Sequence, residues 1–163
     1  MAAHLQERRV AEENTMIEKE TQILQLLSYE TSMQKKRAAL DLLADADDIA
    51  FLIHPLAYRS SWEFCAKALF FIEDARLEPH LPELLAWVEA LNDEGSELVE
   101  FRLQDMQASM LLAPLETFIL QHRDSDSLDW YFGVSRLAAN GLIYPRLSRE
   151  THAVLQQAEQ KVK

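Results

Sequence analysis

The chain has 163 residues, of which 48% are hydrophobic and 26% are charged, and these proportions are typical of one globular domain. Its 16 Lys and Arg against 27 Asp and Glu give a formal net charge of −11, which argues against binding along a nucleic-acid phosphate backbone. Three glycines disfavour an all-β fold with many turns, and one cysteine excludes an internal disulfide.

No stretch of the sequence resembles a signal peptide or a membrane span. Charged residues interrupt the first thirty positions throughout, so no apolar segment there suits a signal-peptide core. No fully apolar run exceeds five residues, whereas a transmembrane helix needs about 20. We therefore expect no membrane association, and the single thiol favours the cytoplasm.

The N-terminal segment is predicted to be one amphipathic helix over residues 5–28. Its apolar residues recur every seven positions, at Val10, Ile17 and Leu24. The intermediate positions of the heptad pattern are Glu13, Glu20 and Leu27, so a coiled-coil seam is weak. The helix is expected either to dock on its own domain or to join a second chain, giving a monomer or a dimer. On this basis residues 1–30 form a partly flexible N-terminal helix, and residues 31–163 form the main domain.

The next segments of the chain also follow helical spacing. A helix is expected over residues 31–44, followed by a short apolar segment over residues 49–53. Residues 62–72 are apolar on nearly every side, and a helix of that kind is normally buried. We therefore expect this helix at the centre of the fold, with Leu69 and Phe71 as core residues.

The C-terminal half continues the same pattern. Apolar residues recur at helical spacing in five further stretches, from Leu81 to Leu91, Val99 to Met110, Leu115 to Ile119, Leu128 to Ala138, and Val154 to Val162. Gly95 and Pro114 are expected to separate the first three.

The spacing of these helices predicts an all-α fold. Helix pairs begin near residues 31, 60, 96 and 126, at a loose spacing of 29, 36 and 30 residues, against roughly 35–40 residues for a typical helix pair of a solenoid. We predict a HEAT-like α-solenoid of about four pairs with the N-terminal helix packed on one end. A compact, irregular helical bundle is the alternative.

Several short motifs carry a family resemblance. They are Trp62-Glu63 before an apolar helix, the stretch Leu81-Pro82-Glu83-Leu84-Leu85-Ala86-Trp87, Asn92, and Asp129-Trp130-Tyr131. With them, residues 46–157 resemble a bacterial family of short HEAT-like helical domains without an assigned function. The family usually has Trp-Pro after the asparagine, where this chain reads Asp93-Glu94-Gly95. The resemblance implies a binding scaffold and no reaction.

No catalytic or metal-binding motif stands out. The five histidines show no i, i+4 pair, and no Cys-x-x-Cys is present. The nearest cluster, Glu78, His80 and Glu83, supports the alternative of a metal-dependent hydrolase, but carboxylates are common at a helix start. Cys65 lies in the most apolar helix and is interpreted as a packing residue. We expect no cofactor, no metal and no enzymatic activity.

The charge is unevenly distributed, which is the main functional signal. Residues 45–129 contain five Lys or Arg and 18 Asp or Glu, a net charge of −13, whereas residues 130–163 contain five and two, a net charge of +3. This asymmetry fits either a solvated surface or an acidic face that attracts a basic protein.

A tryptophan and the acidic residues that follow it are the nominated binding residues. Trp87 lies off the stripe of Leu84, Leu85 and Val88, so it either wedges helices together or lines an exposed groove. We predict a protein-binding scaffold or adaptor, with an immunity-type inhibitor of a basic toxin as an alternative. The predicted binding residues are Trp87, Asp93, Glu94, Glu97 and Glu100.

Overall fold

The computed structural model describes residues 16, 18–27, 32–53, 59–90 and 93–163. These residues form α-helices and short 3-10 helices and contain no strand, which confirms the all-α prediction for this part of the chain. Residues 18–26 are helical, while residues 5–15, 17 and 28 of the predicted N-terminal helix lie outside the described residues. The later α-helices are α2 (Met33–Ala44), α3 (Trp62–Ala68), α4 (Asp74–Leu77), α5 (Leu81–Glu89), α6 (Ser96–Gln104), α7 (Ala108–Gln121), α8 (Asp129–Ala138) and α9 (Arg149–Val162).

Short 3-10 helices connect several of these elements. They are η1 (Ala50–Leu52), η2 (Arg59–Ser61), η3 (Leu69–Phe71), η4 (Glu78–His80) and η5 (Tyr144–Arg146).

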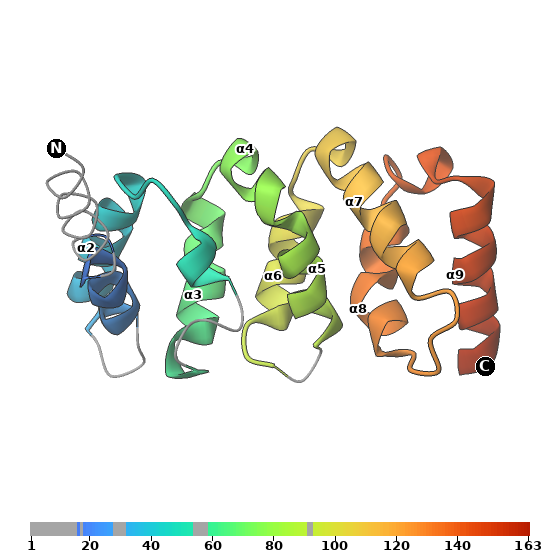
Figure 1. Cartoon of the computed structure of the whole chain (residues 1–163), viewed down its shortest axis with the longest axis horizontal. Coiled ribbons are helices and arrows are strands. Elements are labelled where there is room, and N and C mark those ends of the chain that lie inside the picture. The colour runs from blue at the N-terminus through green and yellow to red at the C-terminus, as the bar shows by residue number, and fades with distance from the viewer. Residues whose placement is uncertain (1–15, 17, 28–31, 54–58, 91–92) are drawn as a thin grey trace, which may run out of the picture.

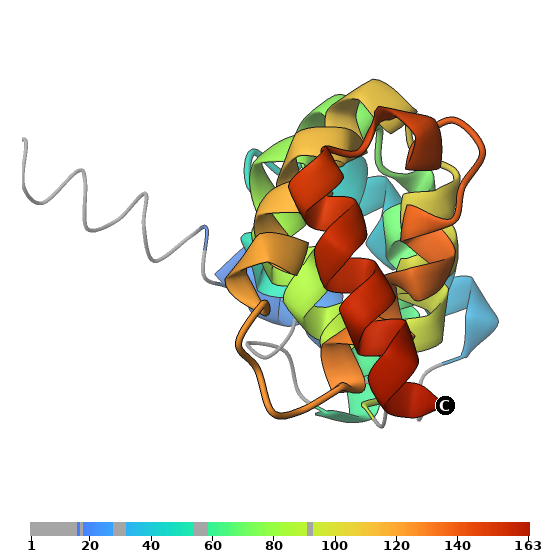
Figure 2. The ribbon, with the colours of Figure 1, turned by 90° about the vertical axis from the view of Figure 1, so that its right-hand side faces the viewer.

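The helices follow one another along the long axis of the molecule (Figure 1). Helix α3 contacts α6, and α6 contacts α8. In the same way α5 contacts α7, and α7 contacts α9. Seen along the axis, α5 and α7 lie on one side and α6 and α8 on the other, while α9 closes the C-terminal end (Figure 2). We call these sides the α5–α7 layer and the α3–α6–α8 layer.

One continuous apolar core runs between the two layers. It includes Ile23, Leu24 and Leu27 from the end of the N-terminal helix, so this part of that helix packs on its own chain. Fully buried leucines of α5 and α7 supply much of the centre.

The segment 62–72 is less buried than its composition predicts. Helix α3 ends at Ala68 and the chain continues as η3, in which Leu69 is fully buried but Phe71 is 72% exposed. A 3-10 turn has three residues per turn, so it rotates the following side chains away from the α-helical stripe. The expectation that Phe71 is a core residue is therefore wrong, whereas the expectation for Leu69 is confirmed.

The boundary between α6 and α7 also differs from the prediction. Helix α6 ends at Gln104, and Pro114 lies inside α7 instead of starting a new helix. The backbone N–H of Gln107, the N-cap residue of α7, donates to Asp74 Oδ2 at 3.1 Å. This contact holds the chain out of helical conformation at Gln107, and no periodicity in the sequence encodes it.

Asp74 also forms an ion pair with Arg102, a buried arginine of α6. The Arg102 guanidinium donates to Asp74 Oδ1 at 2.6 Å and to the carbonyl oxygens of Leu69 and Ile72 at 3.0 and 2.8 Å. Burial opposes ionisation of Asp74, but the hydrogen bonds from Arg102 and Gln107 outweigh it and lower the pKa of this carboxyl. Arg102 therefore links the end of η3 and the start of α4 to α6.

Candidate functional site

Trp87, the aromatic residue of the predicted site, is buried in the structure. Its side chain is fully inaccessible to solvent, and its indole Nε1 donates to the carbonyl oxygen of Glu94 at 3.2 Å. The indole therefore packs beneath the turn that follows α5. The prediction that Trp87 lines an exposed groove is wrong, because the turn folds back over the ring.

Gly95 allows this turn to approach so closely. It adopts φ 87°, a left-handed conformation that favours glycine. A Cβ atom at this position would lie 2.9 Å from Ala66 Cβ and 3.2 Å from Trp87 Cζ2. Gly95, which was expected to separate two helices, is thus the N-cap residue of α6. Its close approach to Ala66 brings the turn against α3.

The four predicted acidic residues lie in different environments. Glu94 and Glu97 are exposed, and Asp93 is half-buried with Oδ1 at 3.9 Å from an Arg59 guanidinium nitrogen. Glu100 is only 2% exposed. Glu94 and Glu97 are therefore the members of the predicted set that present an accessible carboxylate to a partner.

Glu100 instead joins α6 to α8. It accepts from Arg136 at 2.6 Å and from the Gln104 amide at 2.9 Å. Desolvation by burial raises the pKa of Glu100, and the nearby Arg136 charge only partly opposes this effect. Glu100 is thus a structural residue, and its selection as a docking residue is wrong because its carboxylate is enclosed.

Sequence reasoning missed the exposed aromatic side chains of the α3–α6–α8 layer. Phe101 on α6 is 41% exposed and Phe132 on α8 is 48% exposed, and the Arg136 guanidinium lies 5.8 Å from the Phe101 ring centroid. Phe70 and Phe71 are exposed at the end of α3. The available signal was that Phe101 lies off the stripe of buried residues on its helix. We call the exposed surface of α6 and α8 that carries Phe101, Phe132 and Arg136 the aromatic face.

A groove lies between α5 and α7, on the other layer. Its volume is about 540 Å³, within the range of small-ligand sites. Small side chains, Ala86 on one wall and Ala113 on the other, leave space between the two helices. The described lining residues are Pro82, Ala86, Glu89, Ala113, Pro114, Thr117, Phe118, Gln121 and His122.

His122 lies at the polar end of this groove, beside Glu89. Its Nδ1 is 2.8 Å from the Phe118 carbonyl oxygen, and its Nε2 is 3.3 Å from Glu89 Oε1. Both of these neighbours are acceptors, so His122 donates to at least one of them. The ring also stacks on Trp130, with centroids 5.6 Å apart. These contacts on both nitrogens and on one face hold His122 in place.

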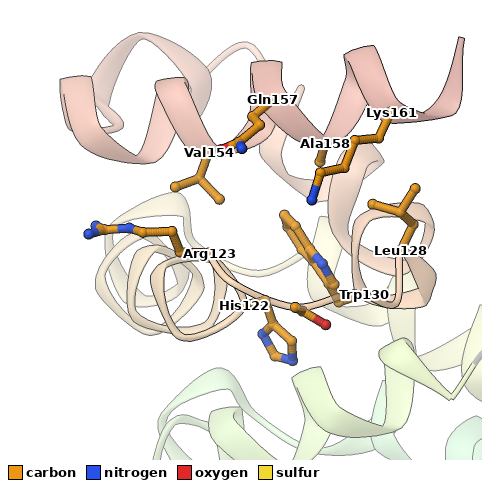
Figure 3. Close-up of a pocket in the computed structure, with 9 residues that line it drawn as sticks. His122, Arg123, Leu128, Trp130, Val154, Gln157, Ala158 and Lys161 are labelled. Atoms are coloured by element: carbon orange, nitrogen blue, oxygen red, sulfur yellow. The ribbon is translucent and has the colours of Figure 1, made fainter.

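A second, much smaller cavity of about 10 Å³ lies where α7, α8 and α9 meet (Figure 3). Val154, Ala158 and Lys161 reach it from α9, and Trp130 forms one wall from α8. Trp130 Nε1 is buried and has no hydrogen-bond partner among the described residues. The cavity has room for about one water molecule.

The residues considered for metal chemistry do not converge. His80 Nε2 lies 3.8 Å from Asp48 Oδ1. Among the described residues, no group of three His, Cys, Asp or Glu side chains could hold a metal ion, and this includes the set Glu78, His80 and Glu83.

Cys65 is buried in α3, as expected for a packing residue. Burial raises the pKa of its thiol to about 12, against a smaller lowering by a hydrogen bond with Ser61, so the thiol stays protonated near neutral pH. In the part of the chain that the structure describes, no helix has the length and apolarity needed to cross a bilayer.

Comparison with known proteins gives no relative. No protein-family model, no curated protein and no solved structure matches the chain significantly.

Proposed function

We propose that this chain is a HEAT-like stack of helix pairs that binds a positively charged protein and has no catalytic role. The order of contacts supports a stack, since α3 reaches α6 and α6 reaches α8, while α5 reaches α7 and α7 reaches α9. Repeat proteins have this property, because each unit contacts only its neighbours. The largely polar α9, at the C-terminal end, resembles the capping helix that such stacks need.

The aromatic face is the observation that carries this proposal. Large aromatic side chains are exposed on successive helices of one layer, where they contribute little to the stability of the fold. Aromatic and arginine side chains are enriched at protein interfaces and often provide much of the binding energy. Phe101 and Phe132, with the Arg136 guanidinium 5.8 Å from the Phe101 ring centroid, fit this composition.

Acidic residues beside the aromatic face favour a basic partner. Glu97 and Asp105 lie four residues before and after Phe101 on the chain, and both are exposed. Glu94 adds a further exposed carboxylate at the start of α6. Carboxylates at the rim of an interface speed association with a cationic protein and make it dependent on salt.

Affinity capture with matched variants tests this function. The double variant Phe101→Ser/Phe132→Ser removes the aromatic anchors, and Leu142→Ser/Val162→Ser removes two comparably exposed apolar side chains elsewhere. We expect a basic host protein to be retained at low salt by the wild type and the control, and lost from the first variant.

Two results would contradict the proposed function. One is that the wild-type chain retains no host protein above a blank resin at low salt. The other is that a retained protein binds the aromatic double variant as well as the wild type and resists elution by salt.

A further inference from the structure

We propose that the groove between α5 and α7 is a second binding site, which takes a short basic segment of a protein with apolar side chains against its floor and a Lys or Arg at Glu89. This site is separate from the aromatic face, because α5 and α7 lie on the opposite layer (Figure 2). The inference therefore goes beyond the proposed function and does not depend on it.

The shape of the groove suits a peptide side chain or two. Ala86 and Ala113 are exposed on its walls, and the buried Phe118 also lines it. From Ala113 to Gln121 the α7 wall is about 12 Å long at 1.5 Å per residue. An extended segment of three or four residues has this length at about 3.3 Å per residue.

The charge of the groove selects a cationic occupant. Helices α5 and α7 contain the carboxylates Glu83, Glu89 and Glu116 and no Lys or Arg. Glu116 is directed to α9, where it accepts from the backbone N–H of Ser148 and from the Thr151 hydroxyl. Of these carboxylates Glu89 lines the groove, so an approaching Lys or Arg is attracted there.

The position of Glu89 gives the site a direction. It lies at one end of the groove, next to His122, while the other end is formed by Pro82 and Pro114. Oε1 of Glu89 faces His122, and a carboxylate can accept several hydrogen bonds, so an incoming guanidinium also finds an acceptor there. The expected ligand therefore has one or two apolar residues on one side of its basic residue.

Synthetic peptides of equal length test this site on the full chain. The probes are three 12-residue peptides, one of Leu and Lys, one of Leu and Glu, and one of Ser and Lys. Binding is measured by fluorescence anisotropy, and the contacted surface is mapped by NMR shifts of the Ala86, Ala113 and Thr117 methyl groups. We expect the Leu–Lys peptide to bind at least about tenfold more tightly than either of the others.

Variants that fill the groove provide the sharper comparison. Ala86→Leu/Ala113→Leu places larger side chains in the groove, while Ala153→Leu makes the same change at an exposed position of α9. The groove variant should weaken Leu–Lys binding about tenfold and the control should leave it unchanged. Glu89→Gln should weaken it about three- to tenfold and flatten its salt dependence, whereas Glu159→Gln on α9 should not. Thermal unfolding verifies that each variant is folded.

Three results of the binding measurements would overturn the groove assignment. These are no measurable binding of the Leu–Lys peptide to the wild type, equal binding of the Leu–Glu peptide, or unchanged affinity in the groove variant. Unchanged methyl shifts of Ala86, Ala113 and Thr117 while the Leu–Lys peptide binds would also overturn it, and would leave the proposed function of the aromatic face intact. Conversely, groove binding by the peptide would stand even if the aromatic face retains no host protein.

Discussion

The two sides of α6 carry similar ion pairs in opposite environments. Toward α3, Arg102 is buried and its partner Asp74 is the more accessible group. Toward α8, Glu100 is buried and its partner Arg136 is 57% exposed. The pKa of Asp74 is lowered by its hydrogen bonds, while the pKa of Glu100 is raised by burial.

This difference illustrates a general rule for ion pairs. A pair stabilises a fold only when the free energy gained from its hydrogen bonds exceeds the free-energy cost of desolvating its charges. Arg102 bonds to a carboxylate and to two carbonyl groups, so it compensates for its own burial. Glu100 has two donors, one of which belongs to a largely solvated side chain. We therefore expect the α3 side of α6 to be the rigid side and the α8 side to tolerate change.

The largest effect is expected from Arg102→Met, on the rigid side. The substitution removes the hydrogen bonds that Arg102 donates to Asp74 Oδ1 and to the carbonyl oxygens of Leu69 and Ile72, and loss of one partner from a buried pair costs about 3–5 kcal/mol. Urea unfolding followed by circular dichroism measures the free energy of unfolding. Arg146→Met, at an exposed position of η5, is the control and should change it by less than about 0.5 kcal/mol. A loss below about 1 kcal/mol for Arg102→Met would remove the distinction between the two sides.

The end of α3 gives the second test. Leu69→Ala opens a cavity in the core and should cost about 2–5 kcal/mol of unfolding free energy, because Leu69 is fully buried. Phe71→Ala should cost less than about 0.5 kcal/mol, since this ring is exposed two residues later. The same urea titrations compare the two variants. Equal losses would mean that the 3-10 turn does not expose Phe71 in solution.

The pH dependence of stability separates the two ion pairs by sign. The lowered pKa of Asp74 gives stability that is present above the unfolded value, about 3.9, and is lost as the pH falls through the folded value. The raised pKa of Glu100 has the opposite effect. The stability that it contributes is present below the pKa of the unfolded chain, about 4.3, and is lost as the pH rises above that value.

Two neutral variants measure these contributions directly. Asp74→Asn should be less stable than the wild type at pH 7 and should approach it in acid. The free energy of unfolding of Glu100→Gln should rise relative to that of the wild type as the pH increases from about 4 to 7. At pH 7 the two values should differ by less than about 1 kcal/mol. Thermal unfolding across this pH range follows both. Parallel pH profiles for the two variants would contradict the assigned environments.

The smallest effect is expected from Glu97→Gln, on the exposed surface of α6. The Glu97 charge adds to the raised pKa of Glu100, so removing it should lower that pKa. Global stability should change by less than about 0.5 kcal/mol, because Glu97 is exposed. Carboxyl NMR titration measures the pKa. An unchanged value for Glu100 would show that these two carboxylates do not interact.

The sequence by itself determined the helical class and most helix positions. The spacing of apolar residues from Leu81 to Val88 places them on one side of α5, and in the structure those on the stripe are buried. Such local patterns are sufficient because hydrogen bonding within a helix and burial of one stripe involve residues close in the chain. The stacked arrangement and the family resemblance remain predictions.

Only the tertiary structure decided which of the nominated residues are accessible. Trp87 is covered by the turn at Gly95, Glu100 is enclosed by Arg136, and Gln107 is held by an aspartate more than thirty residues earlier in the chain. The exposure of Phe101 likewise depends on which sides of α6 its neighbours cover. Periodicity indicates that a helix has an apolar side, but the accessible surface of each residue is set by elements distant in sequence, which approach it only when the chain folds.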